Sequence, residues 1–261
     1  MNLKFTNSTS EYILPKSFKL SISAYKRRTS VNKRYGNDGG VINGDQKADT
    51  RDISIVYEPV YDNDTQYLNY VNELIGFFNP DLGPFYLVDT DNNRRCEISL
   101  NSAVDDANSE GLEFRIGKNN LKFEMLDAHW EDNDEITVTS PTGGLDDDDT
   151  LIIDNDSYSD CYPVIKITPY DTNTDFTILN NTTGASFTLG SNAFIVGAEF
   201  EVDCKNGTIY LTVAGAVTEM SSALADGGGF IKLIPGNNEI KYSSVFGAVD
   251  VEITYRRRYV F

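Results

Sequence analysis

The sequence is poor in the residues on which most enzymes and metal sites depend. It has three cysteines and one histidine in 261 residues, and Cys96, Cys161 and Cys204 form no CxxC pair. An odd number of widely spaced cysteines favours buried, reduced thiols over a disulfide framework or a zinc site. The lone histidine, His129, is not accompanied by a G-x-S-x-G motif. We therefore expect no catalytic activity, no metal and no cofactor.

Long hydrophobic runs are also lacking. No apolar stretch approaches the roughly 18 residues that a membrane span needs, and the start of the chain has no signal-peptide core. We expect no membrane association. We expect the protein to be synthesised in the cytoplasm. No G-x-x-x-x-G-K-[ST] loop occurs, and the glycines at 227–229 lie between predicted strands, which argues against phosphate binding.

Carboxylates, by contrast, are abundant. Among 40 Asp and Glu residues some pair will always resemble a glycosidase dyad, so their presence predicts no hydrolase. The acidic runs at 146–149 and 154–156 do not follow the spacing of an EF-hand. We interpret them as a solvated acidic loop, with adventitious cation binding as the alternative.

The charge is unevenly distributed along the chain. The net charge is −18, yet residues 1–51 hold ten Lys and Arg against four acids, which gives +6, and residues 127–160 hold twelve acids and no Lys or Arg. This polarity does not suit nucleic acid, whose phosphates require a positive face. It favours contact between copies of the chain, and the alternative is two solvated charged faces.

Most of the chain alternates apolar and polar residues, as half-buried strands do. One segment instead repeats apolar residues at three and four positions, which predicts a helix near residues 65–79 that begins at Asp64 or Thr65. Its apolar face comprises Tyr67, Tyr70, Val71, Leu74, Ile75 and Phe78. The fold class is therefore mainly β, with an α+β N-terminal domain.

Residues 30–50 are polar, rich in glycine and poor in core residues. We interpret them as a projecting hairpin arm that turns at Asp38 and Gly39, and an ordinary flexible loop is the alternative. Residues 140–149 have the composition of a linker, because four consecutive aspartates repel one another in a compact core. We place the domains at 1–145 and 146–261, the second being a β-sandwich or jelly roll.

Three stretches resemble the distal tail proteins (Dit) of siphophages. The first is the arm at 34–39 (RYGNDG) followed by 51–55 (RDISI). The second is 160–167 (DCYPVIKI) followed by 176–184 (FTILNNTTG). The third and most specific is 230–242 (FIKLIPGNNEIKY), of the form L-x-P-G-x-N-x-I-x-Y, with the terminal strand at 253–259 (ITYRRRY).

The resemblance implies a structural protein of the phage tail tip. Its first domain would form a hexameric ring, with the arm on the neighbouring subunit, and its second would be a galectin-like β-sandwich. The implied partners are other copies of the chain, the tail tube protein and the hub protein of the tip or baseplate, all within the virion. The aspartate-rich linker is not expected in the family. The only tryptophan, Trp130, lies outside the second domain, which therefore lacks the aromatic side chain that sugar-binding sandwiches most often use to stack a sugar, and this argues against sugar binding more than against the fold.

The alternative function is a carbohydrate-binding module for glycans of the host surface, because β-sandwich domains often bind sugars and the chain has 15 tyrosines. A glycan hydrolase of the tail rests on the carboxylates alone. If the arm mediates contacts between subunits, the residues that we expect to carry them are Arg27, Arg28, Lys33 and Arg34. The acidic segment 127–160 would be their partner.

Overall fold

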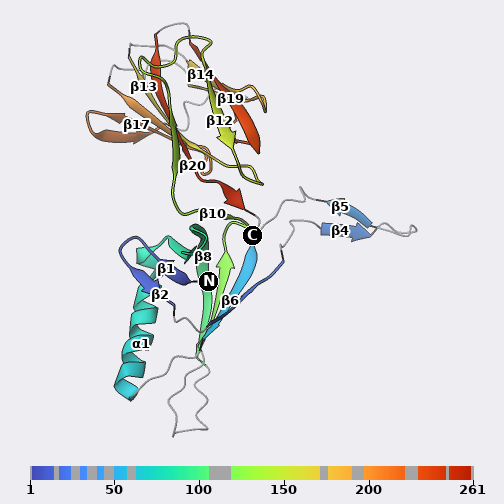
Figure 1. Ribbon diagram of the computed structural model, residues 1–261, viewed down its shortest axis with the longest axis vertical. Helices are drawn as coiled ribbons and strands as arrows, with labels where there is room; N and C mark the ends of the chain where they lie inside the picture. The colour runs from blue at the N-terminus through green and yellow to red at the C-terminus, as the bar shows by residue number, and fades with distance from the viewer. Residues whose placement is uncertain are drawn as a thin grey trace. The chain divides into compact units, whose positions relative to one another are not determined.

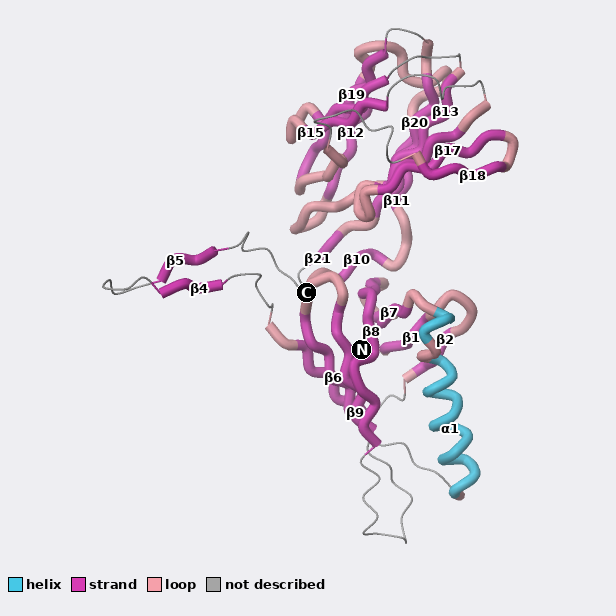
Figure 2. Tube along the Cα trace, turned by 180° about the vertical axis from the view of Figure 1, so that it is seen from behind, coloured by secondary structure: helices cyan, strands magenta, loops and turns pink. Residues whose placement is uncertain are grey.

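The chain divides into two compact units, one from Met1 to Asn133 and the other from Asp134 to Val260. The protein is mostly β, as the sequence predicted (Figures 1 and 2). Within the described ranges, no helix has the length and apolarity that crossing a bilayer requires. The computed structural model describes residues 2–14, 18–24, 30–33, 40–43, 50–57, 63–105, 119–170, 176–189, 197–220, 229–244 and 247–259.

The first unit is built on one antiparallel sheet with the strand order β2-β1-β7-β8-β9-β6-β3, and β10 also pairs with β8. The alternation of the sequence places apolar residues on one face, such as Ile53, Ile55 and Tyr57 of β6, all of which are buried. The strands are β1 (Leu3–Thr6), β2 (Glu11–Ile13), β3 (Phe18–Ile22), β6 (Arg51–Tyr57), β7 (Phe85–Asp89), β8 (Arg94–Asp105), β9 (Asn119–Met125) and β10 (Trp130–Asp132).

Helix α1 (Asp64–Phe77) lies where the apolar spacing predicted it, and a short 3-10 helix η1 (Pro80–Leu82) follows. The N-cap of α1 is Asn63, one residue before the predicted start. The Asn63 side chain accepts a hydrogen bond from the Gln66 N–H at 2.8 Å. The prediction for Ile75 was wrong, because this side chain is 63% exposed and Phe77 is buried instead.

The core of the first unit is an aromatic cluster between α1 and the sheet. The ring of Phe5 lies 5.1 Å from that of Phe123 and 5.2 Å from that of Phe78. Phe78 also contacts Phe77 at 5.0 Å and Phe85 at 5.4 Å. The end of the helix is therefore held to strands β1, β7 and β9 by ring contacts at separations typical of aromatic pairs.

The segment predicted as the arm contains an antiparallel pair of strands, β4 (Ser30–Lys33) and β5 (Gly40–Asn43). They form a two-stranded sheet in which Lys33 is opposite Gly40 and Val31 is opposite Ile42. The predicted turn at Asp38 and Gly39 lies outside the described residues.

The second unit is a sandwich of two antiparallel sheets, with the orders β11-β20-β13-β16-β17-β18 and β12-β19-β14-β15. Ile165 and Ile167 of the first sheet and Ile178 and Tyr242 of the second are fully buried within one core. The strands are β11 (Ile136–Thr139), β12 (Thr150–Asn155), β13 (Val164–Pro169), β14 (Phe176–Asn180), β15 (Ala185–Leu189), β16 (Glu199–Asp203), β17 (Thr208–Val213), β18 (Ala216–Glu219), β19 (Gly236–Ser244) and β20 (Val249–Tyr255), before the short β21 (Arg258–Tyr259).

The division between the units precedes the boundary that the sequence suggested near residue 145, because β11 already pairs with β20 of the sandwich. Gly144 is not a flexible linker residue. Its φ is +83°, and a Cβ atom there would lie 2.6 Å from the Val249 carbonyl oxygen. Leu145 exchanges both backbone hydrogen bonds with Val249, at 2.8 and 3.1 Å, so this stretch is fixed to β20.

Candidate functional site

Of the four residues expected to contact a neighbouring subunit, Arg27, Arg28 and Arg34 lie outside the described residues. Lys33 ends strand β4, where its backbone pairs with Gly40. The assignment of subunit contacts to these four residues stays a prediction.

The acidic run at 146–149, expected to be a solvated linker, is a turn held against β19. The Asp148 carboxylate forms an ion pair with the Lys241 amine at 2.7 Å, and this hydrogen bond raises the pKa of Lys241. The Asp147 side chain accepts hydrogen bonds from the Ser243 hydroxyl at 3.2 Å and from the Ser244 N–H at 3.0 Å. Donors from β19 therefore offset the repulsion between the aspartates.

Negative charge nevertheless remains at the surface of this region. The Asp148 side chain is 71% exposed despite its ion pair, and the Asp156 side chain is 87% exposed at 4.0 Å from Arg257. A charged surface of this kind can attract a basic segment in a salt-dependent manner.

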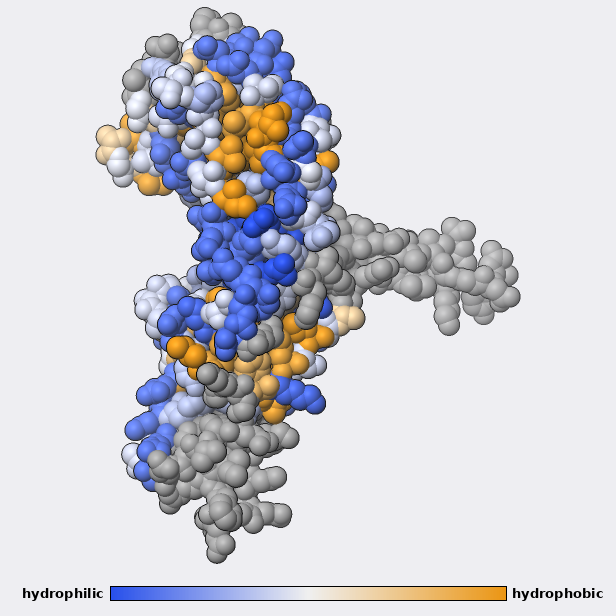
Figure 3. Space-filling view, viewed as in Figure 1, coloured by the Kyte–Doolittle hydropathy of each residue, from blue (hydrophilic) through white to orange (hydrophobic). Residues whose placement is uncertain are grey.

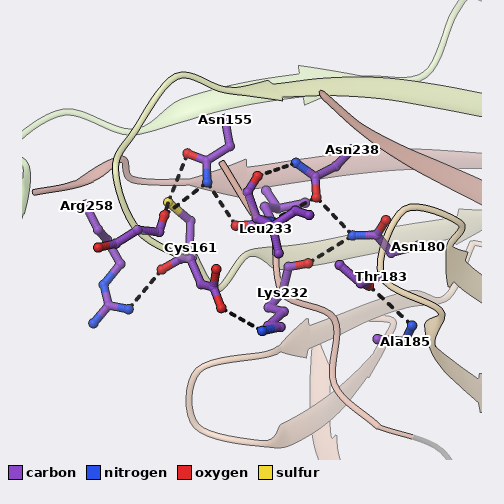
Figure 4. A network of polar contacts seen from close by, with 12 residues as sticks. Asn155, Cys161, Asn180, Thr183, Ala185, Lys232, Leu233, Asn238 and Arg258 are labelled. Atoms are coloured by element: carbon purple, nitrogen blue, oxygen red, sulfur yellow. Dashed lines mark hydrogen bonds and ion pairs between the residues drawn. The ribbon is translucent and has the colours of Figure 1, made fainter. Parts of the chain in front are cut away.

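Three buried asparagines organise one end of the sandwich (Figure 4). Asn238 of β19 makes four hydrogen bonds: its Oδ1 accepts from the Ile234 N–H and from Asn180 Nδ2, and its Nδ2 donates to the Ile234 and Gly236 carbonyls. Asn180 Nδ2 also donates to the Lys232 carbonyl at 2.9 Å, and Asn155 Nδ2 donates to the Leu233 carbonyl at 2.9 Å.

The same network joins the second and third stretches of the tail-protein resemblance. Cys161 and Leu233 exchange backbone hydrogen bonds at 2.9 Å, and the Lys232 amine contacts the Asp160 carboxylate at 2.6 Å. Arg258 donates to the Asp160 carbonyl at 2.9 Å (Figure 4). These signature residues are joined to one another by hydrogen bonds, so the motif has a structural role in the sandwich.

The thiols are poorly suited to nucleophilic chemistry. Burial raises the pKa of Cys96 and of Cys161, and it raises the pKa of Cys204 to about 12. A protonated, inaccessible thiol is a weak nucleophile. His129 Nδ1 lies 3.1 Å from the Asp127 carboxylate. Across the described residues, no group of three or more His, Cys, Asp or Glu could hold a metal ion.

The outer face of the six-stranded sheet contains an open hollow of about 390 Å³. One row of paired residues runs across this sheet, in which Thr139 is opposite Glu252, Glu252 is opposite Lys166, and Lys166 is opposite Glu201. Thr139, Glu252 and Lys166 of this row line the hollow. The hollow is lined by Thr139, Ser140, Lys166, Thr168, Glu199, Asp250, Val251 and Glu252. Sequence reasoning missed this site, since its residues come from four strands and only their outward alternation was readable.

The outer face of the four-stranded sheet is different in character. Hydrophobic surface lies over β12 and β19 in Figure 3. Ile152 of β12 is 56% exposed. Ile152 is opposite Glu239 in the sheet register. The polar hollow and this apolar patch therefore belong to different sheets of the same sandwich.

Two family models match the chain, and one falls within each unit. The phage tail protein RIFT-related domain matches residues 6–125, and the siphovirus-type tail component, C-terminal domain, matches residues 156–259. No curated protein matches the chain.

Solved structures share the fold over nearly the whole chain. The crystal structure of the phage SPP1 Dit protein, described as a paradigm of the hub adsorption apparatus of phages that infect Gram-positive bacteria, matches with a TM-score of 0.71, 15% identity and 98% coverage of both chains. Two structures of the phage p2 baseplate in its activated conformation, with strontium and with calcium, match with a TM-score of 0.53, 8% and 7% identity and 97% coverage of both chains.

The sequence and the fold both resemble those of siphophage tail proteins. Both family models describe siphophage tail components, and they occur in succession along the chain. The architecture follows that of SPP1 Dit from one end to the other. The chain belongs to the family of siphophage distal tail proteins.

Proposed function

We propose that the chain forms an oligomeric ring, of six copies, that joins the tail tube to the hub or baseplate at the tail tip. The observation that supports this most is the likeness to SPP1 Dit over 98% of both chains. The second comparison, to a phage baseplate, fits the same location. The tail tube protein and the hub protein are the neighbours that this role requires.

The β4–β5 hairpin supports contact between subunits. In the part of the chain that the structure describes, these two strands pair only with each other. A two-stranded hairpin is marginally stable alone, so it gains most by lying on another subunit. Repeated head-to-tail contacts of this kind close into a ring when the rotation allows it.

Electrostatics supplies a partner for the arm. Lys33 ends β4, and Arg27, Arg28 and Arg34 are close to it in the sequence. Exposed aspartates such as Asp148 and Asp156 give the second unit a negative surface. We infer that these charges orient the subunits as they associate, and that the resulting assembly is sensitive to salt.

The proposed role needs no chemistry. The buried thiols and the single histidine fit a protein that acts by binding alone, made in the host cytoplasm and incorporated into the virion.

The test is the mass of the purified chain by light scattering at low and high salt, alone and with the tail tube and hub proteins. We expect a mass near six subunits that decreases as salt rises. Reversing the charge of Arg27, Arg28, Lys33 and Arg34 together should abolish the assembly, whereas Lys205→Glu, on an exposed turn of the second unit, should not. A strict monomer in every mixture would contradict the proposal.

A further inference from the structure

The hollow on the six-stranded sheet has an unusual combination of groups. Lys166 lies 3.8 Å from a Glu199 oxygen and 3.7 Å from a Glu201 oxygen, and both distances exceed those of a hydrogen bond. Its side chain is only 39% exposed. Among the described residues no closer acceptor is found for the amine, so its donors remain available to a ligand in the hollow.

Acceptors lie next to this donor. Glu252 is directly opposite Lys166 on β20, and Glu199 and Asp250 also line the hollow. The hydroxyls of Thr139 and Thr168 can donate or accept. Donors, acceptors and groups of both kinds thus surround one space of the size that holds a small molecule.

An aromatic ring stands beside the hollow. The Tyr170 hydroxyl donates a hydrogen bond to Asp250 at 2.7 Å, and Tyr170 is 42% exposed. Ser140 also bonds to the Asp250 carboxylate, at 3.5 Å, and its oxygen accepts from the Val251 N–H at 3.1 Å. Asp250 is thereby fixed in position, and the ring of Tyr170 is held at the edge of the site.

The composition of the hollow excludes several classes of ligand. Its lining has three carboxylates against one amine, which repels phosphates and acidic sugars. Its only apolar lining residue is Val251, so a lipid or an aromatic compound would bury few of its atoms against matching surface. No described group of side chains gathers as metal ligands do.

We propose that this hollow binds a saccharide that carries no acidic group. Sugar hydroxyls both donate and accept, so they match a site that offers an amine, carboxylates and hydroxyls together. Tyr170, which is 42% exposed and is bonded to Asp250 of the lining, can provide the apolar surface on which one face of a pyranose lies, in place of the tryptophan that the second unit lacks. The proposal does not depend on ring formation by the first unit.

The experiment is a binding screen of the full chain on an array of neutral, amine-bearing and acidic oligosaccharides, followed by calorimetry with the binders. Neutral or amine-bearing sugars should bind, and oligogalacturonate should not. The variants Lys166→Gln and Glu199→Gln should each weaken binding by roughly tenfold, the loss of one hydrogen bond to a charged group.

Glu239→Gln, on the outer face of the other sheet, is the matched control and should bind as the parent does. If Lys166→Gln proves unfolded in denaturant titrations, Glu252→Gln tests the same space from β20. A screen without any binder, a preference for acidic sugars, or unchanged affinity in the folded hollow variants would overturn the proposal. The light-scattering mass of each variant should match the parent, which separates this result from the ring.

Discussion

The two units use different contacts in their cores. In the first, rings such as Phe5 and Phe123 meet 5.1 Å apart in an aromatic cluster. In the second, an aliphatic core is joined at one end by Asn155, Asn180 and Asn238, each of them 0% exposed and fully engaged in hydrogen bonds. One core is held mainly by non-directional apolar contact, and the other adds bonds that have a single correct geometry.

The difference matters because the two kinds of contact respond differently to substitution. An apolar core tolerates a change of shape if its volume is nearly kept. When a buried amide is replaced by an apolar side chain, the donors and acceptors that it contacted are left without a hydrogen-bond partner from protein or water. The stability of the sandwich should therefore depend on the hydrogen-bonding groups of its buried side chains. The stability of the first unit should depend on the volume of its buried side chains.

The largest effect is expected from Asn238→Leu, which keeps the approximate volume but removes four hydrogen bonds. We expect a loss of about 3 kcal/mol or more in the unfolding free energy of the second unit. Denaturant titration followed by near-ultraviolet circular dichroism would measure it. The neighbouring Asn237→Ala, at an exposed position, should change stability by no more than about 0.5 kcal/mol. Equal losses in the two variants would contradict the role of the amide.

A smaller effect is expected from Phe5→Leu in the aromatic cluster. Leucine keeps part of the buried apolar surface but loses ring contacts to Phe78 and Phe123, so we expect a loss of about 1–2 kcal/mol confined to the first unit. The same titration measures it, with the second transition as an internal reference. A loss larger than that of Asn238→Leu would reverse the comparison.

The ion pair between Lys232 and Asp160 should contribute less, at most about 1 kcal/mol, because both side chains are partly exposed. The hydrogen bond from the Lys232 amine to Asp160 raises the pKa of Lys232 above its ordinary value of 10.5. The stabilisation is therefore complete below pH 10.5 and is lost as the pH rises through the raised value. Thermal melts of the parent and of Lys232→Met should differ at pH 7 and converge as the pH rises above 10.5 and through the raised pKa. A constant difference would show that the lost contact is not ionic.

The smallest effect is a difference in how readily the two units open. Thiol labelling can measure it without a substitution, because each unit contains a buried cysteine. Cys96 reports on the first, and Cys161 and Cys204 on the second. In the native protein at pH 8 all three should react with a thiol reagent more slowly than a free thiol by several orders of magnitude, because burial raises their pKa. Mass spectrometry of labelled peptides at rising denaturant would show which unit opens first. Fast native labelling would contradict the burial.

The sequence predicted the β class and the helix through patterns that are local. Alternation and helical spacing act over a few residues, so α1 was placed within two residues of its observed bounds. The exposed Ile75 shows the limit, because both Ile75 and Phe77 fit a helical spacing and only packing against the sheet selects one.

The acidic turn could not be predicted, because its partner Lys241 is remote in the sequence. Four aspartates in a row suggested a solvated linker, and only the register of β19 reveals the donors that they meet. The hollow was missed for the same reason. Each of Thr139, Lys166 and Glu252 is an unremarkable polar residue of its own strand, and the pairing of strands brings them together.

The pairing of β11 with β20 has a consequence for how the protein is made. Ile136, at the start of the sandwich, is opposite Tyr255, near its end. The six-stranded sheet therefore cannot be completed until β20 has emerged from the ribosome, whereas strands β1 to β10 all precede it in the chain. Contacts between residues so distant in sequence also slow folding. The first unit should thus be folded, and able to meet its neighbours, while the sandwich is still being synthesised.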